Sequence, residues 1–227
     1  ATRSSLDIAR AMGDDAQVQG NLNNLSNIAA SRGEWERARE LLEEALAIGE
    51  VIGDTWGVAL ESMNLGSLLL REGELDRAEG LFRAAARLIA DLGDKRDMPG
   101  LYWLLAEVAR QRGDLGAAAG ALEQSLGIAR DIGDSQMIAS ALSGLAQMAH
   151  SAGDWDTALV LTRQSIRAFD QYGDMIGAAG CLDVLADIAL ATGAVARAAW
   201  CIGANEGVLA RHGVSRMEMF PGEYQAR

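Results

Sequence analysis

The stretch from Thr55 to Asp94 reads TWGVALESMNLGSLLLREGELDRAEGLFRAAARLIADLGD and decides the fold of this chain. Two helix-length segments lie in it, separated by Gly73 and closed by Gly93. The same unit returns four more times, over residues 15–54, 95–134, 135–174 and 175–214. A fixed period of this size predicts stacked helix pairs in which each unit packs mainly on its neighbours.

Glycine marks the end of every predicted helix. A Gly-Asp pair recurs at an interval of 40 residues, with its glycine at positions 13, 53, 93, 133 and 173, and a second glycine stands halfway, at 33, 73, 113, 153 and 193. The last unit departs from this pattern and ends in Gly213-Val214. We interpret these glycines as left-handed residues that stop a helix, and an acid such as Asp54 as the N-cap of the next helix. A metal- or phosphate-binding loop is the alternative interpretation of the Gly-Asp pairs.

These features predict an all-α fold, a right-handed α-solenoid of antiparallel helix pairs. Residues 1–14 match the second helix of a unit, so we expect the chain to begin inside a longer array. The range 15–214 holds five 40-residue repeats. Residues 215–227 leave the period, and we expect Met217, Met219 and Phe220 to cover the open end of the stack or to begin a further helix.

Composition excludes several classes of partner. The formal net charge is −12, which disfavours direct nucleic-acid binding because that requires clustered basic residues. Apolar residues make up 49% of the chain, yet no apolar run reaches the roughly 18 residues of a membrane span. No segment of the chain has the pattern of a signal peptide. We therefore expect a cytoplasmic protein that does not bind a membrane.

The sequence shows no catalytic constellation, and we expect neither an enzyme nor a bound cofactor. The phosphate-binding motif G-x-x-x-x-G-K-[ST] is absent. The two histidines, His150 and His212, are too far apart in a repeat array to share a metal, so no metal site is expected. Cys181 and Cys201 are interpreted as small buried residues, with a disulfide as the alternative.

One column of the predicted first helices is polar in all five repeats, although most of the surface of these helices should be buried. The column and the positions one turn away form a stripe that must face solvent and that we interpret as a ligand-binding surface. An ordinary wetted surface is the alternative, but an exposed Trp103 or Met63 favours binding. The candidate ligand-binding residues are Asn23, Asn27, Met63, Ser67, Arg71, Trp103, Glu107, Arg110, Gln111, Ser143, Gln147, His150, Asp183 and Asp187.

The repeat resembles the tetratricopeptide repeat. That family has a large residue, then Leu-Gly or Leu-Ala, a glycine in the middle of the unit, and spaced small or bulky residues in the second helix. The second unit carries this pattern as Leu65, Gly66, Leu69, Gly73, Leu75, Ala78, Phe82 and Ala85, and the third as Tyr102, Leu105, Ala106, Gly113, Leu115, Ala118 and Leu122. Serine or asparagine replaces the expected small residue at Ser26, Ser125, Ser165 and Asn205. The resemblance implies that the polar stripe lies on a concave face that holds peptides.

The period of this repeat is longer than the roughly 34 residues that are usual in the family, and it resembles two subgroups. One is the sensor region of large bacterial STAND regulators of the maltose-regulator and antibiotic-regulator type, and the other is the eukaryotic spindle-orientation adaptor. The segment 197–206, RAAWCIGANE, is similar to the closing repeat of the bacterial regulators. The resemblance implies a protein- or peptide-binding sensor, or a partner-docking module, attached to further domains. A small-molecule effector sensor and a stand-alone adaptor are the alternatives.

Overall fold

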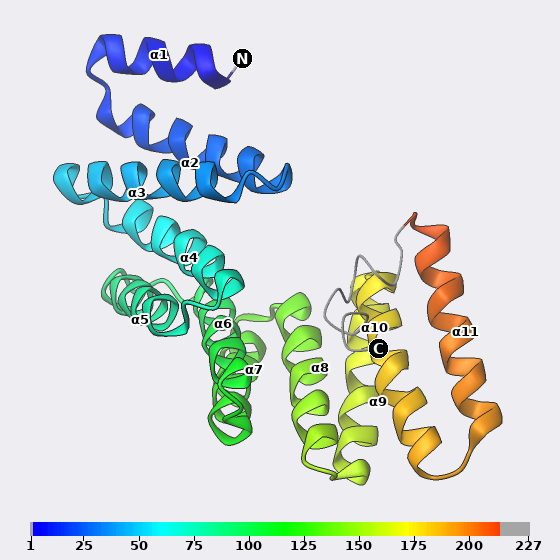
Figure 1. Ribbon diagram of the computed structural model, residues 1–227. Helices are drawn as coiled ribbons and strands as arrows, with labels where there is room; N and C mark the ends of the chain where they lie inside the picture. Colours follow the sequence, from blue (N-terminus) through cyan, green and yellow to red (C-terminus); the bar gives the residue numbers. More distant parts are fainter. Residues whose placement is uncertain (1, 214–227) are drawn as a thin grey trace. The chain divides into compact units, whose positions relative to one another are not determined.

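The computed structural model describes residues 2–213, which form eleven α-helices without a β-strand (Figure 1). The predicted all-α fold of sequential antiparallel helix pairs is therefore confirmed. The helices are α1 (Thr2–Met12), α2 (Asp15–Ser31), α3 (Trp35–Ile52), α4 (Thr55–Glu72), α5 (Leu75–Asp91), α6 (Met98–Gln111), α7 (Leu115–Ile132), α8 (Ser135–Ser151), α9 (Trp155–Tyr172), α10 (Met175–Ala191) and α11 (Val195–Arg211).

The helices group into two compact units, Ala1–Asp114 and Leu115–Arg227. In the first unit each helix packs on the next along the chain, and α2 and α6 both also contact α4. In the second unit α7 to α11 pack in the same sequential way, and α8 also contacts α10. The boundary falls inside the third repeat, whose first helix α6 and second helix α7 belong to different units.

A left-handed glycine follows each of the eleven helices, at every twentieth position from Gly13 to Gly213, with φ between 68° and 85°. The predicted helix stops are thereby confirmed. The predicted N-caps are also found, since Asp54 accepts a hydrogen bond from the backbone N–H of Gly57 at 3.0 Å. The same cap is formed by Asp14, Asp134, Asp154 and Asp174.

Asp94 is the exception among the predicted caps. It accepts hydrogen bonds from the backbone and the guanidinium of Arg96, and α6 begins only at Met98 with Pro99 in its first turn. Proline fits there because its missing N–H is not needed in the first turn of a helix. The extra residues of this turn leave Asp94 outside the helix that it was expected to cap.

Replacing Gly93 by valine should lower the free energy of unfolding by about 1–3 kcal/mol, because a β-branched residue is strained at a φ of +70°. Gly80 provides a matched control on the preceding helix α5, where a Cβ would meet nothing within 4 Å. Gly80→Ala should stabilise the protein by about 0.5–1 kcal/mol, because alanine favours a helix interior. Thermal and urea unfolding measure both changes, and a Gly93→Val protein as stable as the parent would contradict the assignment.

The core of the first unit is built from facing apolar stripes. Phe82 of α5 is fully buried between α4 and its neighbours, and a Cβ at Gly66 would lie 2.6 Å from its ring. Gly66 therefore allows the aromatic ring to approach the backbone of α4. Smaller clusters in the second unit include Phe169 with Cys181 and Val184 with Ile188.

A buried polar pair joins α2 to α4. Gln19 and Glu61 are each only 2% exposed, and Gln19 Nε2 donates a hydrogen bond to Glu61 Oε2 at 3.0 Å. Among the described residues, Gln19 Oε1 has no partner. Burial raises the pKa of Glu61 from 4.5 to about 7, although the bond from Gln19 lowers it, and the charge of Asp54 raises it further. A protonated Glu61 can donate its hydrogen to a neighbouring acceptor such as Gln19 Oε1.

The stability of the protein should depend on pH through Glu61. The folded chain keeps the Glu61 proton up to about pH 7, whereas an unfolded glutamate releases it near 4.5, so the folded state binds more protons between these values. The free energy of unfolding should therefore fall by on the order of 2 kcal/mol as the pH rises from 4.5 through 7.

Glu61→Gln is the reference for this measurement, because glutamine mimics the neutral acid and removes the titration. The difference in unfolding free energy between the parent and Glu61→Gln, measured in urea across this pH range, isolates Glu61 from the other carboxylates. A difference that stays constant with pH would show that Glu61 titrates normally in the folded protein.

No helix within residues 2–213 is long and apolar enough to cross a membrane. Cys181 and Cys201 are both buried and free, which confirms that they are not paired with each other. The expected cover by Met217, Met219 and Phe220 lies outside the described residues.

Candidate functional site

The polar stripe lies on the first helix of each repeat, and the structure leaves it accessible. In the first unit its members are exposed or half-buried on α2, α4 and α6: Asn23, Asn27, Met63, Ser67, Arg71, Trp103, Glu107, Arg110 and Gln111. In the second unit they are exposed or half-buried on α8 and α10: Ser143, Gln147, His150, Asp183 and Asp187. Because α2 contacts α4 and α4 contacts α6, neighbouring stripe residues can act together within a unit.

A pocket of about 220 Å³ forms where α2 and α4 meet the start of α3. Three stripe residues line it, Asn27, Ser67 and Arg71. Its apolar wall consists of Ala30, Trp35, Ala38, Leu42 and Leu68, and its further polar lining of Ser26 and Asn64. We call this the stripe pocket. It combines one positive charge with amide and hydroxyl groups over an apolar floor.

Arg71 is held in the stripe pocket by Trp35. Its guanidinium carbon lies 3.9 Å from the centroid of the indole ring, which is a cation–π contact. Among the described residues Arg71 has no carboxylate partner, so its N–H groups can reach a ligand. Stacking on the indole orients the planar guanidinium and lowers the entropy lost when it binds a carboxylate.

Amide groups connect the stripe across repeats. Asn64 Nδ2 on α4 donates to Asn23 Oδ1 on α2 at 3.0 Å. Ser67 Oγ donates to the backbone carbonyl of Met63 at 2.8 Å, so its lone pairs remain available to accept. Side chains of this kind can hydrogen bond the backbone of an extended peptide.

The α6 part of the stripe is electrostatically different. Arg110 donates to Glu107 at 2.8 Å through Nε and also through one terminal nitrogen, and Gln111 donates to the same carboxylate at 3.2 Å. The pKa of Arg110 is raised, chiefly by its hydrogen bond to Glu107. The charge of Arg110 is therefore already balanced, while Trp103 next to this cluster keeps 38% of its surface exposed.

In the second unit the stripe residue His150 lies close to an aromatic ring and to a carboxylate. The ring of His150 packs edge-on against Trp155 with centroids 5.0 Å apart, and its Nε2 lies 3.7 Å from Asp187 Oδ2. Ser143 lies 3.7 Å from the buried thiol of Cys181, whose pKa is raised by burial. Within residues 2–213, no group of three or more His, Cys, Asp or Glu side chains forms a metal-binding cluster.

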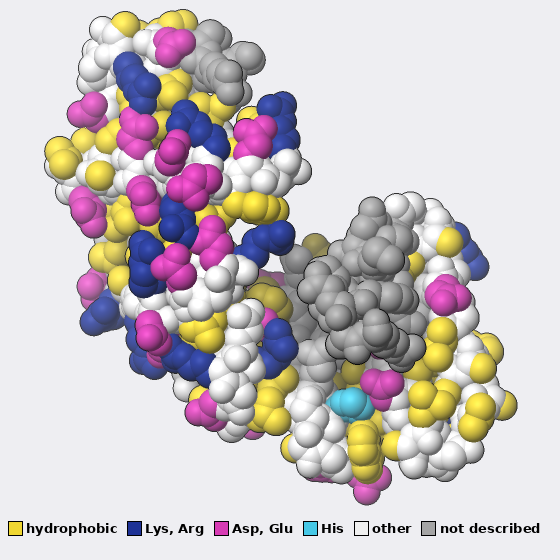
Figure 2. Space-filling model, viewed as in Figure 1, with side chains coloured by type: hydrophobic (Ala, Val, Ile, Leu, Met, Phe, Trp, Pro, Cys, Tyr) yellow, Lys and Arg dark blue, Asp and Glu magenta, His cyan; other side chains and the backbone are white. Residues whose placement is uncertain are grey.

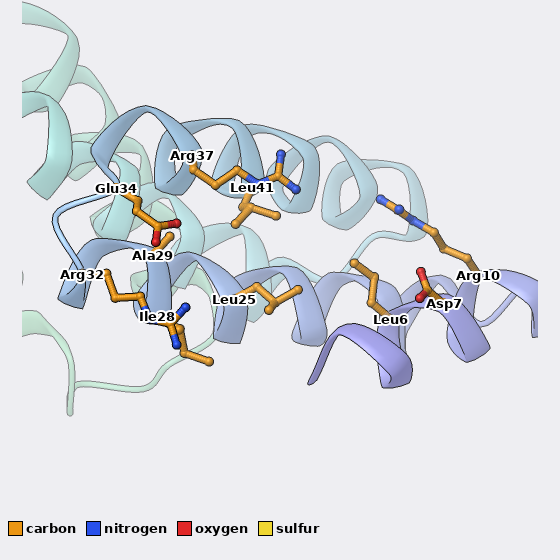
Figure 3. A pocket seen from close by; sticks show the side chains of 10 residues that line it. All are labelled: Leu6, Asp7, Arg10, Leu25, Ile28, Ala29, Arg32, Glu34, Arg37 and Leu41. Atoms are coloured by element: carbon orange, nitrogen blue, oxygen red, sulfur yellow. The ribbon is translucent and has the colours of Figure 1, made fainter. Parts of the chain in front are cut away.

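A second pocket, of about 490 Å³, lies between α1, α2 and α3 (Figure 3). Arg10 reaches from α1 toward α3, where it forms an ion pair with Glu44, and Leu41 points from α3 toward α2. None of the stripe residues lines this pocket. Its ten lining residues are Leu6, Asp7, Arg10, Leu25, Ile28, Ala29, Arg32, Glu34, Arg37 and Leu41.

Three family models of the tetratricopeptide repeat match this chain, over residues 22–52, 63–96 and 97–171. Together they cover well over half of the sequence and include the helix pairs that frame the stripe pocket. The chain belongs to the tetratricopeptide-repeat family. A comparison with curated proteins finds no match.

Solved structures show the same fold. The crystal structure of BtubC (BKLC) from P. vanneervenii is similar with a TM-score of 0.78 and 20% identity, covering 95% of this chain and 91% of that one. A Rap protein complexed with Competence and Sporulation Factor has a TM-score of 0.74 and 14% identity, covering 86% of this chain and 54% of that one. A STAND protein with a tetratricopeptide repeat sensor from Pyrococcus horikoshii has a TM-score of 0.74 and 16% identity, covering 92% and 31%. The chain thus spans only part of the last two proteins.

Two features of this tetratricopeptide-repeat site were not predicted from the sequence. Trp35 was expected only as a core residue of α3, yet it also forms the floor under Arg71. Asn64 lies outside the predicted stripe, yet the equivalent position holds Leu104, Gly144 or Val184 in later repeats. A polar residue where later repeats have an apolar residue or glycine is the feature of the sequence that could have indicated its role. Arg71 and Arg110 are both predicted to meet an acidic group of the ligand, and Glu107 already occupies the guanidinium of Arg110. Arg71 is the better candidate for that contact.

Proposed function

We propose that this tetratricopeptide-repeat domain is a protein-binding module that holds an extended peptide segment or a helix of a partner on the polar stripe. The observation that carries the proposal is the stripe pocket, where a guanidinium stacked on Trp35 lies beside the amides of Asn27 and Asn64 and the hydroxyl of Ser67. This combination suits a carboxylate or an acidic side chain next to peptide backbone groups.

The size of the pocket favours a peptide over a small effector. Its volume of about 220 Å³ is below the roughly 300–1,000 Å³ of typical small-molecule sites. A pocket this small accommodates one side chain or one chain terminus, while the rest of the ligand lies along the stripe. Trp103 on α6 offers an exposed aromatic surface for a further contact, 38% of it accessible to solvent.

We further propose that the domain acts as the sensor or partner-docking part of a larger cytoplasmic signalling regulator and that it recognises its ligand without catalysing a reaction. The support is the similarity in fold to the sensor-bearing STAND protein and the closing segment Arg197–Glu206. Acidic surface and the small number of unpaired basic residues on the stripe disfavour nucleic acid as the ligand.

Substitutions on the stripe should separate this proposal from an ordinary wetted surface. Peptides selected on the domain from a displayed library provide the ligand, and calorimetric titration measures its affinity. Arg71→Ala and Trp103→Ala should each weaken binding by about 2 kcal/mol or more, because central aromatic and arginine residues concentrate binding energy. Arg71→Lys should lose part of the affinity, because lysine keeps the positive charge but lacks the planar guanidinium that stacks on an aromatic ring and donates two parallel hydrogen bonds.

Two further variants serve as references. Arg110→Ala should have a smaller effect than Arg71→Ala, because Glu107 already balances the charge of Arg110. Glu43→Ala on α3, which does not line the stripe pocket, should leave the affinity unchanged. Equal affinities across all five proteins would remove the binding site from the stripe.

A further inference from the structure

A groove on the second unit is not part of the stripe. It has a volume of about 550 Å³ and lies between the start of α9, the end of α10 and the start of α11. Two tryptophans and two arginines line it, and the remaining lining is mainly apolar, apart from Asp156 and Thr192. We call this the α9–α11 groove. Its four distinctive residues are Trp155, Trp200, Arg163 and Arg197.

The repeat provides an internal comparison for this groove. The pocket in Figure 3 has the equivalent place on α2 and α3, four repeats earlier in the sequence. Its residues Leu25, Ile28, Ala29, Arg37 and Leu41 correspond to Leu185, Ile188, Ala189, Arg197 and Cys201 of the α9–α11 groove. The pocket and the α9–α11 groove are therefore built from equivalent residues of two repeats. The residues that differ between them indicate how the chemistry of the groove departs from that of the pocket.

The arginine shared by the two places is neutralised in the first unit. Arg37 forms an ion pair with Glu40 at 2.7 Å. In the next repeat the same position is Arg77, which pairs with Glu74 at 2.6 Å. Helices α3 and α5 of the first unit thus carry arginines close to acids, and Figure 2 shows blue and magenta side chains interspersed on this unit.

The equivalent arginine of the α9–α11 groove is Arg197, and neither of these two acids is present in its repeat. The position of Glu74 is taken by Ala194, and the position of Glu40 is taken by Trp200. Among residues 2–213, neither Arg197 nor Arg163 forms an ion pair or a side-chain hydrogen bond. Arg163 stands at the repeat position of Glu43, which lies 4.0 Å from Arg77, and of Arg83, which forms an ion pair with Glu79 at 2.7 Å.

The α9–α11 groove also exposes the aromatic side chains of two tryptophans. Trp200 leaves 68% of its surface accessible and Trp155 leaves 38%. The position of Trp200 holds Glu40, Gly80, Gly120 and Val160 in the earlier repeats, so a large aromatic side chain is not required by the helix packing there. Aromatic side chains exposed beside uncompensated arginines are typical of surfaces that bind another molecule.

We propose that the α9–α11 groove is a second docking surface, which binds an acidic peptide segment of a partner protein through one large apolar side chain flanked by Asp or Glu. The apolar side chain would enter between Trp155 and Trp200, and the flanking carboxylates would meet Arg163 and Arg197. Charge complementarity supports this occupant, because Arg163 and Arg197 line the same groove and neither forms an ion pair within residues 2–213.

The test uses the full chain and short fluorescent peptides, each with one Phe, Leu or Trp flanked by Asp and Glu, together with matched peptides in which Lys replaces the acids. Fluorescence anisotropy measures affinity at low and at physiological salt. The acidic peptides should bind and weaken with salt, and the lysine peptides should not bind. The double variant Arg163→Glu with Arg197→Glu should weaken the acidic peptides by about tenfold or more, and Trp200→Ala should do the same.

Arg167→Glu is the matched control, because Arg167 is an exposed residue of α9 that does not line the groove. It should leave the affinity unchanged, and far-ultraviolet circular dichroism should show the same helix content in all variants. Trp103→Ala, on the stripe, should also leave the binding of these peptides unchanged, which distinguishes the groove from the site of the proposed function.

Four outcomes would overturn the proposal. They are equal binding of acidic and lysine peptides, no binding of either, equal losses in the Arg167→Glu control and the double variant, and loss of the acidic peptides in Trp103→Ala. Light scattering adds a fifth: self-association of the chain that the double variant abolishes would assign the groove to a second copy instead of an acidic partner.

Discussion

The left-handed glycine at every twentieth position is the constraint on which the rest of this structure depends. At φ values between 68° and 85° the chain leaves one helix and can start the next almost at once, as it does at Gly53. A residue with a Cβ is strained in this region, so the glycines fix where each helix ends. The constant spacing of the glycines keeps equivalent residues of successive repeats in register. The polar stripe and the pairing of Arg37 and Arg77 with acids both follow from that register.

Register also explains how one repeat can be modified without disturbing the fold. Residues that face the core are mostly apolar in every repeat, whereas positions 40, 80, 120, 160 and 200 vary from glutamate to tryptophan. The helix framework tolerates these changes because the positions lie outside the buried layers. A repeat domain can therefore acquire local surfaces of different chemistry, such as the ion-paired helices of the first unit and the aromatic, basic groove between α9 and α11.

Polar side chains contribute differently inside and outside the stack. Gln19 and Glu61 join α2 and α4 in the interior, and burial raises the pKa of Glu61 and so favours its neutral form. On the stripe the polar side chains remain accessible to solvent. Whether such a side chain can bind a ligand depends on the neighbouring residue that it already contacts. Glu107 occupies Arg110, while Trp35 orients Arg71 without neutralising it. A charge stacked on an aromatic ring is ready for a ligand in a way that a paired charge is not.

Sequence periodicity alone determined the eleven helices, their glycine stops, most of their aspartate caps and the accessible stripe, because each of these depends on local spacing or on short-range hydrogen bonds. The exception at Asp94 arose because the turn before Pro99 is longer than its counterparts, and its geometry is set by Arg96. Only the tertiary structure placed Trp35 under Arg71, brought Asn64 to Asn23 and buried Glu61 beside Gln19. These contacts join residues about one repeat apart, and the rotation of one helix against the next selects which of several polar side chains meet. The sequence contains the residues for each contact, but packing between repeats decides which of them become neighbours.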